Sequence, residues 1–258
     1  MKSHSEKPAE QYKHYDIGIV QTMLSFCFIL AAVTLLFFNL GSLISTLTAH
    51  WLPLLLATFF GLCLADFVTG VVHWLADSYG STRAAVVGQR IIQPFRVHHI
   101  NPSDFLNRSF VDTNGDTSIL ATLALAGMLF WDHESTGAEL LKAGTLAFLG
   151  VVTFANQFHK WAHVRRPPLF VRALQRCRFI LTNDAHARHH TYPHCGDYCI
   201  ALGWCNPILE RVQFFRRTER LIELLTGIQA RKEEDSMFEE LKQVSRQQRR
   251  LERSSESA

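Results

Sequence analysis

The stretch IGIVQTMLSFCFILAAVTLLFFNL, residues 17–40, contains no Asp, Glu, Lys or Arg. A helix needs about 20 apolar residues to cross the hydrocarbon core of a bilayer, so this stretch is long enough to span a membrane. It is too long for the apolar core of a cleavable signal peptide, and no A-x-A-like cleavage site follows it. The chain is therefore expected to be a membrane protein.

Three further apolar stretches set the expected number of spans. Residues 52–76 are about as long as the first stretch, although they carry Asp66 and His73. Residues 117–131 and 140–158 are shorter, and only DHESTGAE separates them. So short a connector favours a transmembrane hairpin, with a buried helix pair as the alternative. We expect four spans in total.

Basic residues support this arrangement. Nearly all Lys and Arg fall in the segments 1–16, 77–116 and 159–258, whereas the connectors 41–51 and 132–139 contain none. Lys and Arg mark the cytosolic side of a membrane protein, so both termini and the 77–116 loop are expected in the cytosol. The net charge of +3 is too small to argue for nucleic-acid binding.

The predicted fold is all-α: a multi-pass membrane protein of about four transmembrane helices with a cytosolic, histidine-rich helical cap. Residues 1–16 are expected to be a cytosolic tail, 17–228 the membrane-embedded domain, and 229–258 a polar tail. Within the domain, residues 207–228 are expected to form amphipathic helices on the membrane surface, a cap over the site, or both. The compartment stays open between the endoplasmic reticulum of a eukaryote and the inner membrane of a bacterium.

Histidine is the residue type that indicates function. The chain has 13 histidines, and nine of them are expected to converge on the cytosolic face of the membrane. These nine are His73, His98, His99, His159, His163, His186, His189, His190 and His194. The other four, His4, His14, His50 and His133, are expected to be ordinary surface residues.

The spacing of these residues predicts shared helix faces. Asp66, Gly70, His73 and Asp77 follow at i, i+4, i+7 and i+11, which places them on one stripe of a helix, and Gly70 leaves room there for a close neighbour. Asn156, His159 and His163 form a second stripe. An ionisable group inside a membrane span is costly and marks function by default, which applies to Asp66, His73 and Asp77.

Nine imidazoles are too many for one catalytic zinc, which takes three protein ligands. No H-E-x-x-H motif is present, so the usual general base of a zinc protease is missing. Imidazole also suits iron, and two iron ions with four or five ligands each match the number. Iron that activates dioxygen can remove hydrogen from an unactivated C–H bond, so a membrane-bound site of this kind predicts a lipid chain as substrate.

Several long motifs resemble one family. They are ADFVTGVVHWLADSYGS (65–81), QPFRVHHINPSDFLNRSFVDTNGD (93–116), TFANQFHKWAH (153–163), HARHHTYPH (186–194) and YCIALGWCNPILERVQFFRR (198–217). The chain is similar to the plasmanylethanolamine desaturases, a family that also includes a bacterial light-response protein and a plant chloroplast palmitate desaturase. The resemblance covers roughly residues 52–228.

The resemblance implies oxygen-dependent formation of a vinyl ether between carbons 1 and 2 of the alkyl chain of an ether phospholipid. It implies the nine histidines as ligands of a di-iron centre and Asp77 as the acid beside them. Asp77 is expected to hydrogen-bond a ligand imidazole. Asn156 is expected to be a weak or water-mediated ligand, or otherwise a packing residue.

Several other residues have more than one possible role. Asp66 is expected to bond a neighbouring span or a histidine. Asp112 and Asp116 are expected to shape a turn around Asn114-Gly115, with a role at the site as the alternative. The six cysteines lack the spacing of a disulfide scaffold and are expected to be reduced thiols. A zinc site built from Cys195, Cys199 and Cys205 is the poorly spaced alternative.

No G-x-G-x-x-G in a strand–turn–helix setting is present, so electrons are expected from a separate carrier. The resemblance implies a cytochrome b5-type protein or a ferredoxin. A group of basic residues predicts either a docking patch for an acidic partner or contact with anionic lipid headgroups. These residues are Lys160, Arg165, Arg166, Arg172, Arg176 and Arg178. The oligomeric state is not indicated.

Three other functions stay open. The first is desaturation or hydroxylation of a fatty acyl chain, because the position attacked depends on a pocket that the sequence does not reveal. The second is a metal-binding membrane scaffold or sensor without turnover, which would need far fewer histidines. The third is a zinc hydrolase, which metal analysis would distinguish from an iron enzyme.

Overall fold

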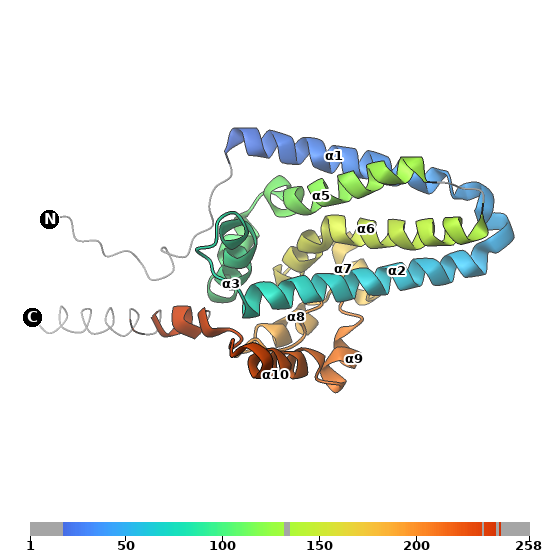
Figure 1. The fold of residues 1–258 in the computed structure, drawn as a ribbon. Helices are drawn as coiled ribbons and strands as arrows, with labels where there is room; N and C mark the ends of the chain where they lie inside the picture. The colour runs from blue at the N-terminus through green and yellow to red at the C-terminus, as the bar shows by residue number, and fades with distance from the viewer. Residues whose placement is uncertain (1–17, 132–134, 234, 241–242, 244–258) are drawn as a thin grey trace, which may run out of the picture. The chain divides into compact units, whose positions relative to one another are not determined.

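The computed structural model describes residues 18–131, 135–233, 235–240 and 243, and every regular element in this part of the chain is a helix (Figure 1). The all-α membrane fold is thereby confirmed. His4, His14 and His133 lie outside the described residues, as do the N-terminal tail 1–16 and most of the C-terminal tail.

The chain divides into two compact units. The larger unit comprises Ile17–His73 and Arg108–Phe215. The smaller unit comprises Met1–Asp16, Trp74–Asn107 and Arg216–Ala258. We describe each unit by itself.

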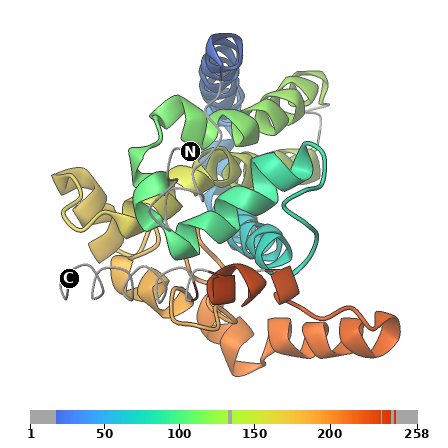
Figure 2. The same ribbon diagram turned by 90° about the vertical axis from the view of Figure 1, so that its left-hand side faces the viewer.

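Long helices run side by side in the larger unit (Figure 1). They are α1 (Ile19–Gly41), α2 (Ile44–Ser78, of which the larger unit holds the part up to His73), α5 (Phe110–Gly127) and α6 (Thr136–His163). Figure 2 shows them from one end, so that α1 is seen nearly along its axis. Short helices complete this unit: η2 (Met128–Phe130), α7 (Leu169–Arg176), α8 (Asn183–His189) and α9 (Asn206–Arg211).

Among the residues that the structure describes, three helices are long and apolar enough to cross a membrane: Ile19–Gly41, His50–Ser78 and Thr136–His163. In contrast to a helix of a soluble protein, these helices expose many apolar side chains and bury some polar ones. In α1, Ser25 and Asn39 are buried while Phe37 and Phe38 are 68% and 67% exposed. Apolar side chains that face outward at this density fit a lipid environment, and the buried Asn39 amide nitrogen donates to the carbonyls of Leu35 and Leu125, at 2.9 and 3.3 Å.

The fourth predicted span, 117–131, falls on α5 and η2, and α5 begins earlier than expected, at Phe110. Because its first turns are polar, α5 is not among the three helices above. It nevertheless packs on α6, where the Thr117 hydroxyl donates to the Thr153 carbonyl over 3.0 Å. The predicted partner helix of α6 is therefore present, and its N-terminal turns are more polar than expected.

The turn predicted around Asn114-Gly115 is wrong, because both residues lie inside α5. Ser109 caps this helix by accepting a hydrogen bond from the Asp112 backbone N–H over 3.1 Å, which starts the helix upstream of the expected turn. Gly115 serves helix packing, since a Cβ there would lie 2.3 Å from the Ser25 hydroxyl oxygen of α1.

Small residues also let α2 and α6 approach closely. A Cβ on Gly61 would lie 2.0 Å from the Gly144 carbonyl oxygen, so the two backbones are in direct contact there. Membrane helices associate through such small-residue contacts, because lipid removes the hydrophobic drive between them. Nearer its start, α2 kinks at His50 (φ −134°, ψ 38°), three residues before Pro53, which lacks the N–H that a continuous helix needs.

The smaller unit surrounds the end of α2. It contains residues 74–78 of α2, η1 (Gly88–Ile92), α3 (Gln93–Ile100), α4 (Pro102–Asn107), most of α10 (Phe214–Thr226) and the segment that follows α10. Glu219 of α10 accepts hydrogen bonds from the Trp74 indole over 2.8 Å and from the Arg231 guanidinium. Arg231 and Glu233, at the start of the predicted polar tail, thus take part in the packing of this unit.

Candidate metal centre

Two helices of the larger unit supply most of the imidazoles. In α6, His159 and His163 are one turn apart near the C-terminal end, as the predicted stripe requires. In α8, His186 and His189 are buried, and His190 follows as the C-terminal cap. The sequence NDAHARHH is thus a single short helix that presents three imidazoles.

The start of α8 is fixed to the end of α6. The Thr182 hydroxyl caps α8 by accepting a hydrogen bond from the Ala185 N–H over 3.2 Å. The Asn183 amide donates to the carbonyls of Ala162 and Val164, at 2.8 and 2.9 Å. Those carbonyls have no partner within α6, so one side chain satisfies the end of one helix while positioning the next.

Four imidazoles converge through the same ring atom. The Nε2 atom of His186 lies 2.9 Å from that of His159, 2.8 Å from that of His163 and 3.0 Å from that of His190. The Nε2 atoms of His159 and His163 are 3.3 Å apart. A mutual hydrogen-bond network of four neutral imidazoles would need alternating donors and acceptors, and each ring carries only one N–H.

These distances match a shared metal ion. Imidazole nitrogens bind Zn²⁺ at about 2.0–2.1 Å, so two nitrogens on one ion are expected roughly 2.9–3.4 Å apart for angles between 90° and tetrahedral. The observed separations of 2.8–3.3 Å fall close to that range. The donor set of nitrogens alone suits a transition metal rather than Ca²⁺ or Mg²⁺, which prefer oxygen.

A second pair of imidazoles lies in the same unit. The rings of His73 and His189 are 4.5 Å apart, and each offers a ligand nitrogen within 4.8 Å of the other. The His189 Nδ1 lies 2.8 Å from the Gly196 carbonyl oxygen. Since a carbonyl only accepts, Nδ1 carries the proton and Nε2 keeps its lone pair for a metal.

The last predicted ligand of this unit, His194, is buried but stands farther away. Its ring centroid is 6.5 Å from that of His189 and 6.4 Å from that of His190. Among the described residues it belongs to neither group of candidate ligands whose atoms lie within 4.8 Å of one another. Its place in a metal site stays a prediction.

The electrostatics favour neutral rings. Burial lowers the pKa of His186 well below its ordinary value, and the neighbouring rings of His159, His163 and His190 lower it further. A neutral imidazole has a free lone pair, whereas an imidazolium cannot bind a metal. The site is therefore ready to bind a metal at neutral pH without first losing protons.

A carboxylate inside α2 holds the loop that follows the histidines. Asp66 is fully buried and accepts hydrogen bonds from the backbone N–H groups of Leu202, Gly203 and Cys205, at 2.8, 2.9 and 2.9 Å. The loop, rather than a span or a histidine, is thus its partner. Hydrogen bonds to a charged acceptor are about twice as strong as neutral ones, which compensates for burying the charge.

Tyr198 braces the same loop against the imidazoles. Its hydroxyl donates to the His194 carbonyl over 2.7 Å, and its ring centroid lies 5.2 Å from that of His189 and 5.9 Å from that of His73. The predicted close neighbour of Gly70 is Cys199, whose Sγ would be 2.6 Å from a Cβ at that position. These contacts explain why the 198–205 segment sits directly against α2.

Three predicted site residues belong to the smaller unit. Asp77 and His99 are buried, and the Asp77 carboxylate oxygen lies 3.9 Å from the His99 Nε2 atom, within ion-pair range and longer than a hydrogen bond. The His98 and His99 rings are 4.4 Å apart. Both imidazoles and the carboxylate are therefore grouped within this unit.

Arg96, two residues before His98, is almost completely buried. Its guanidinium donates to the carbonyls of Ala76 and Tyr79, at 3.0 and 2.8 Å, and so caps the end of α2. The sequence did not indicate Arg96, Asn183 or Tyr198, because each acts through a backbone carbonyl that no local pattern identifies.

The remaining candidates have structural contacts. The Asn156 amide donates to the Thr113 carbonyl of α5 over 3.1 Å, as expected for a packing residue, and its predicted role at a metal stays untested. Asp112 lies in the first turn of α5, where a negative charge is favourable. The six cysteines are free thiols, and neither candidate metal group among the described residues includes one.

Membrane-length apolar helices and a buried cluster of imidazoles define an integral membrane protein with a candidate histidine metal centre. The chain belongs to the lipid desaturase family, whose domain matches residues 62–233. No solved structure is significantly similar to it.

Curated relatives carry more specific names. The plasmanylethanolamine desaturase of Myxococcus xanthus is 40% identical over 184 residues, covering 71% of this chain and 65% of the relative. The plasmanylethanolamine desaturase 1 of Mus musculus is 36% identical over 225 residues, covering 84% of this chain and 82% of the relative. The chloroplastic fatty acid desaturase 4 of Arabidopsis thaliana is 33% identical over 208 residues, covering 78% of this chain and 62% of the relative. The chain thus spans just under two thirds of the bacterial relative's length.

Proposed function

We propose that the protein is an oxygen-dependent desaturase that converts plasmanylethanolamine to a plasmalogen. The family match and the names of the bacterial and mouse relatives support a lipid substrate of this class. The observation that carries the proposal is the convergence of the Nε2 atoms of His159, His163 and His190 on that of His186, each within 3.0 Å.

The reaction would remove one hydrogen from each of carbons 1 and 2 of the alkyl ether chain. Dioxygen, two electrons and two protons are consumed, and the vinyl ether and two waters are formed. Neither C–H bond is acidic, so general acid–base groups cannot break it. Two iron ions would supply the oxygen activation that the side chains lack.

The nine histidines named from the sequence are the proposed ligands of these ions, with Asp77 and Asn156 beside them. Asp77 would hydrogen-bond a ligand imidazole and stabilise its ligating tautomer, a role that typically accounts for a factor of 10–100 in metal affinity or activity. Asn156 would contribute a weak or water-mediated contact. The nitrogen-only set in α6 and α8 fits the proposed metal better than it fits a structural hydrogen-bond network.

The chain's own groups perform the remaining tasks. Asn183 and Asp66 fix α8 and the loop after it, so that the imidazoles do not have to reorganise when a metal binds. Burial of His159, His186 and His189 keeps water from the reacting atoms. A site from which water is excluded protects the oxidising centre from side reactions.

Electrons would come from a separate carrier, a cytochrome b5-type protein or a ferredoxin. Five arginines near the end of α6 and along α7 are exposed: Arg165, Arg166, Arg172, Arg176 and Arg178. An exposed basic surface suits a negatively charged partner and would increase its rate of association at low salt. The active site would face the cytosol, in the endoplasmic reticulum membrane of a eukaryote or the inner membrane of a bacterium.

Lipid analysis tests the proposal. Cells that lack plasmalogens, supplied with an alkyl ether lipid, are expected to accumulate vinyl ether lipid only when they express this chain. The purified protein is expected to contain about two iron ions per chain. Zinc in place of iron, or an unchanged lipid profile with a folded protein, would contradict the proposal.

A second candidate is desaturation of a fatty acyl chain. The similarity to the Arabidopsis fatty acid desaturase over 78% of this chain supports it. The same expression experiment separates the two functions, because an acyl desaturase would add a double bond to fatty acids released by alkaline hydrolysis. A vinyl ether instead releases an aldehyde in acid.

A further inference from the structure

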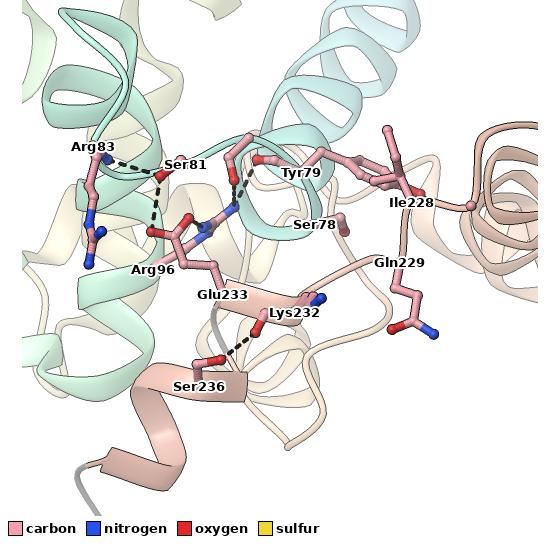
Figure 3. A pocket seen from close by; sticks show the side chains of 12 residues that line it. Ser78, Tyr79, Ser81, Arg83, Arg96, Ile228, Gln229, Lys232, Glu233 and Ser236 are labelled. Atoms are coloured by element: carbon pink, nitrogen blue, oxygen red, sulfur yellow. Dashed lines mark hydrogen bonds and ion pairs between the residues drawn. The ribbon is translucent and has the colours of Figure 1, made fainter.

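The smaller unit contains a pocket of about 640 Å³ that the proposed chemistry does not use. One side is formed by the end of α2 and the loop after it, and the other by the segment that follows α10 (Figure 3). The volume lies within the roughly 300–1,000 Å³ that is usual for sites of small ligands.

Hydrogen bonds and an ion pair hold the inner wall of the pocket in place. Besides capping α2, Arg96 donates to the Glu233 carboxylate over 2.7 Å. Glu233 also accepts hydrogen bonds from the backbone N–H and the hydroxyl of Thr82, at 3.2 and 2.6 Å. Burial raises the pKa of Glu233, but the bonds from Thr82 and the Arg96 charge outweigh it and lower the pKa below its ordinary value. The pair is therefore ionised, and its charges offset each other.

Two further cations line the pocket without such compensation. Arg83 and Lys232 are exposed, and within the described ranges neither side chain has an ion-pair partner. Figure 3 shows them on either side of Glu233. The lining side chains thus carry three positive charges and one negative charge, a net charge of +2. Arg and Lys in such a setting are the usual ligands of a phosphate group.

The location favours a phosphate that belongs to a lipid. Ser78, which lines the pocket, is the last residue of the candidate span His50–Ser78, so the pocket opens where that span ends. Ile228, another lining residue, is 55% exposed. The same unit exposes further large apolar side chains, namely Val86, Val87, Leu224 and Leu225. Exposed apolar residues next to uncompensated cations are typical of a surface at the level of lipid headgroups.

We propose that this pocket binds the phosphate of a phospholipid headgroup, with Arg83 and Lys232 supplying the charge. The proposal rests on the proposed function for the identity of the lipid. Carbons 1 and 2 of an alkyl ether chain lie next to the glycerol, so a fixed headgroup would limit which carbons can reach the metal. The pocket wall is also continuous in sequence with predicted site residues, since Ser78 follows Asp77 and Arg96 precedes His98 by two positions.

Binding to the full-length protein in detergent tests the pocket directly. The probes are dihexanoyl phosphatidylethanolamine below its micelle concentration, inorganic phosphate, and dihexanoylglycerol, which has no phosphate. The test variant is the double substitution Arg83→Gln with Lys232→Gln. The matched control is Arg217→Gln with Arg220→Gln, which removes two exposed charges of α10 that do not line the pocket.

We expect the wild type to bind the phospholipid more tightly than the other two probes. The test variant is expected to weaken that binding at least tenfold, and the control by less than twofold. Equal binding of inorganic phosphate would reject the lipid as the source of the phosphate group. Equal binding of dihexanoylglycerol, or an unaffected test variant, would reject the pocket.

Steady-state kinetics separates this proposal from the proposed function. With plasmanylethanolamine as substrate, the test variant is expected to raise KM about tenfold and to leave kcat within twofold of the wild type. If the wild type binds the phospholipid through Arg83 and Lys232 but forms no vinyl ether, the proposed function fails and the pocket stands. If the wild type is active and the test variant has an unchanged KM, the pocket fails alone.

Discussion

The Nε2 atom of His186 in α8 lies 2.8 Å from the Nε2 atom of His163 in α6, although 23 positions separate the two residues in the sequence. His186 also lies within 3.0 Å of His159 and His190 through the same atom. It is thus the residue that all members of the group share. Because the His186 ring contacts each of the other three imidazoles, its removal is expected to disrupt metal binding by the whole group.

The first prediction concerns this shared residue. The substitution His186→Ala is expected to lower bound iron and desaturase activity at least tenfold, because it removes one ligand and leaves a gap between the other three. Metal content by mass spectrometry and lipid product by chromatography measure the two effects. His50→Ala is the control, since His50 lies at the kink of α2 outside the group. Full iron content in the His186 variant would contradict a metal site at this position.

The second prediction concerns pH and metal removal. Burial lowers the folded-state pKa of His186 below its ordinary value of 6.5, so the unfolded chain binds more protons once the pH falls below about 6.5. The stability of the chelator-treated protein is expected to decrease as the pH is lowered through this value, by at most about 1.4 kcal/mol per pH unit for this group. Above pH 6.5 the group is neutral in both states and contributes no pH dependence.

The variant His186→Gln isolates that contribution. Its thermal midpoint, measured between pH 5 and 8 after chelation, is expected to change less steeply with pH than that of the wild type. Identical pH profiles for the two proteins would show that His186 is not held neutral by burial.

The third prediction concerns Asp66. The substitution Asp66→Asn keeps the shape but replaces one acceptor oxygen by a donor, so at least one of the three backbone N–H groups loses its partner. The expected loss of stability is about 2–3 kcal/mol, as for a buried hydrogen bond to a charged group. Thermal unfolding in detergent measures it. Asp184→Asn, at an exposed position in the first turn of α8, is expected to cost less than about 1 kcal/mol.

The fourth prediction concerns the contact of α2 with α6. The substitution Gly61→Ala places a methyl group 2.0 Å from the Gly144 carbonyl oxygen, so the two helices must separate. A loss of about 1–3 kcal/mol is expected, as for overpacking of a tight core. Gly127→Ala is the control, because a Cβ at that position meets no atom within 4 Å. Equal midpoints of unfolding for both variants would contradict the close packing.

The sequence predicted the three helices that are candidate membrane spans, because span length and apolar composition are local properties. The predicted start of the 117–131 span was too late. The Ser109 cap begins α5 upstream, at Phe110, and so adds polar turns to the helix. The same cap explains why the Asn114-Gly115 pair forms no turn. A helix that is capped and packed on both α1 and α6 overrides the weak local preference of an Asn-Gly pair.

The sequence by itself determined the membrane class, the family motifs and the identity of the candidate ligands, since helical spacing aligns His159 with His163 and His186 with His190. Only the tertiary structure decided that these two pairs meet through their Nε2 atoms, and that Asp66, Asn183 and Tyr198 hold them in place. The physical reason is that these supporting side chains act on backbone N–H and carbonyl groups. Every residue carries such groups, so a one-dimensional pattern cannot show which of them a folded chain brings within reach.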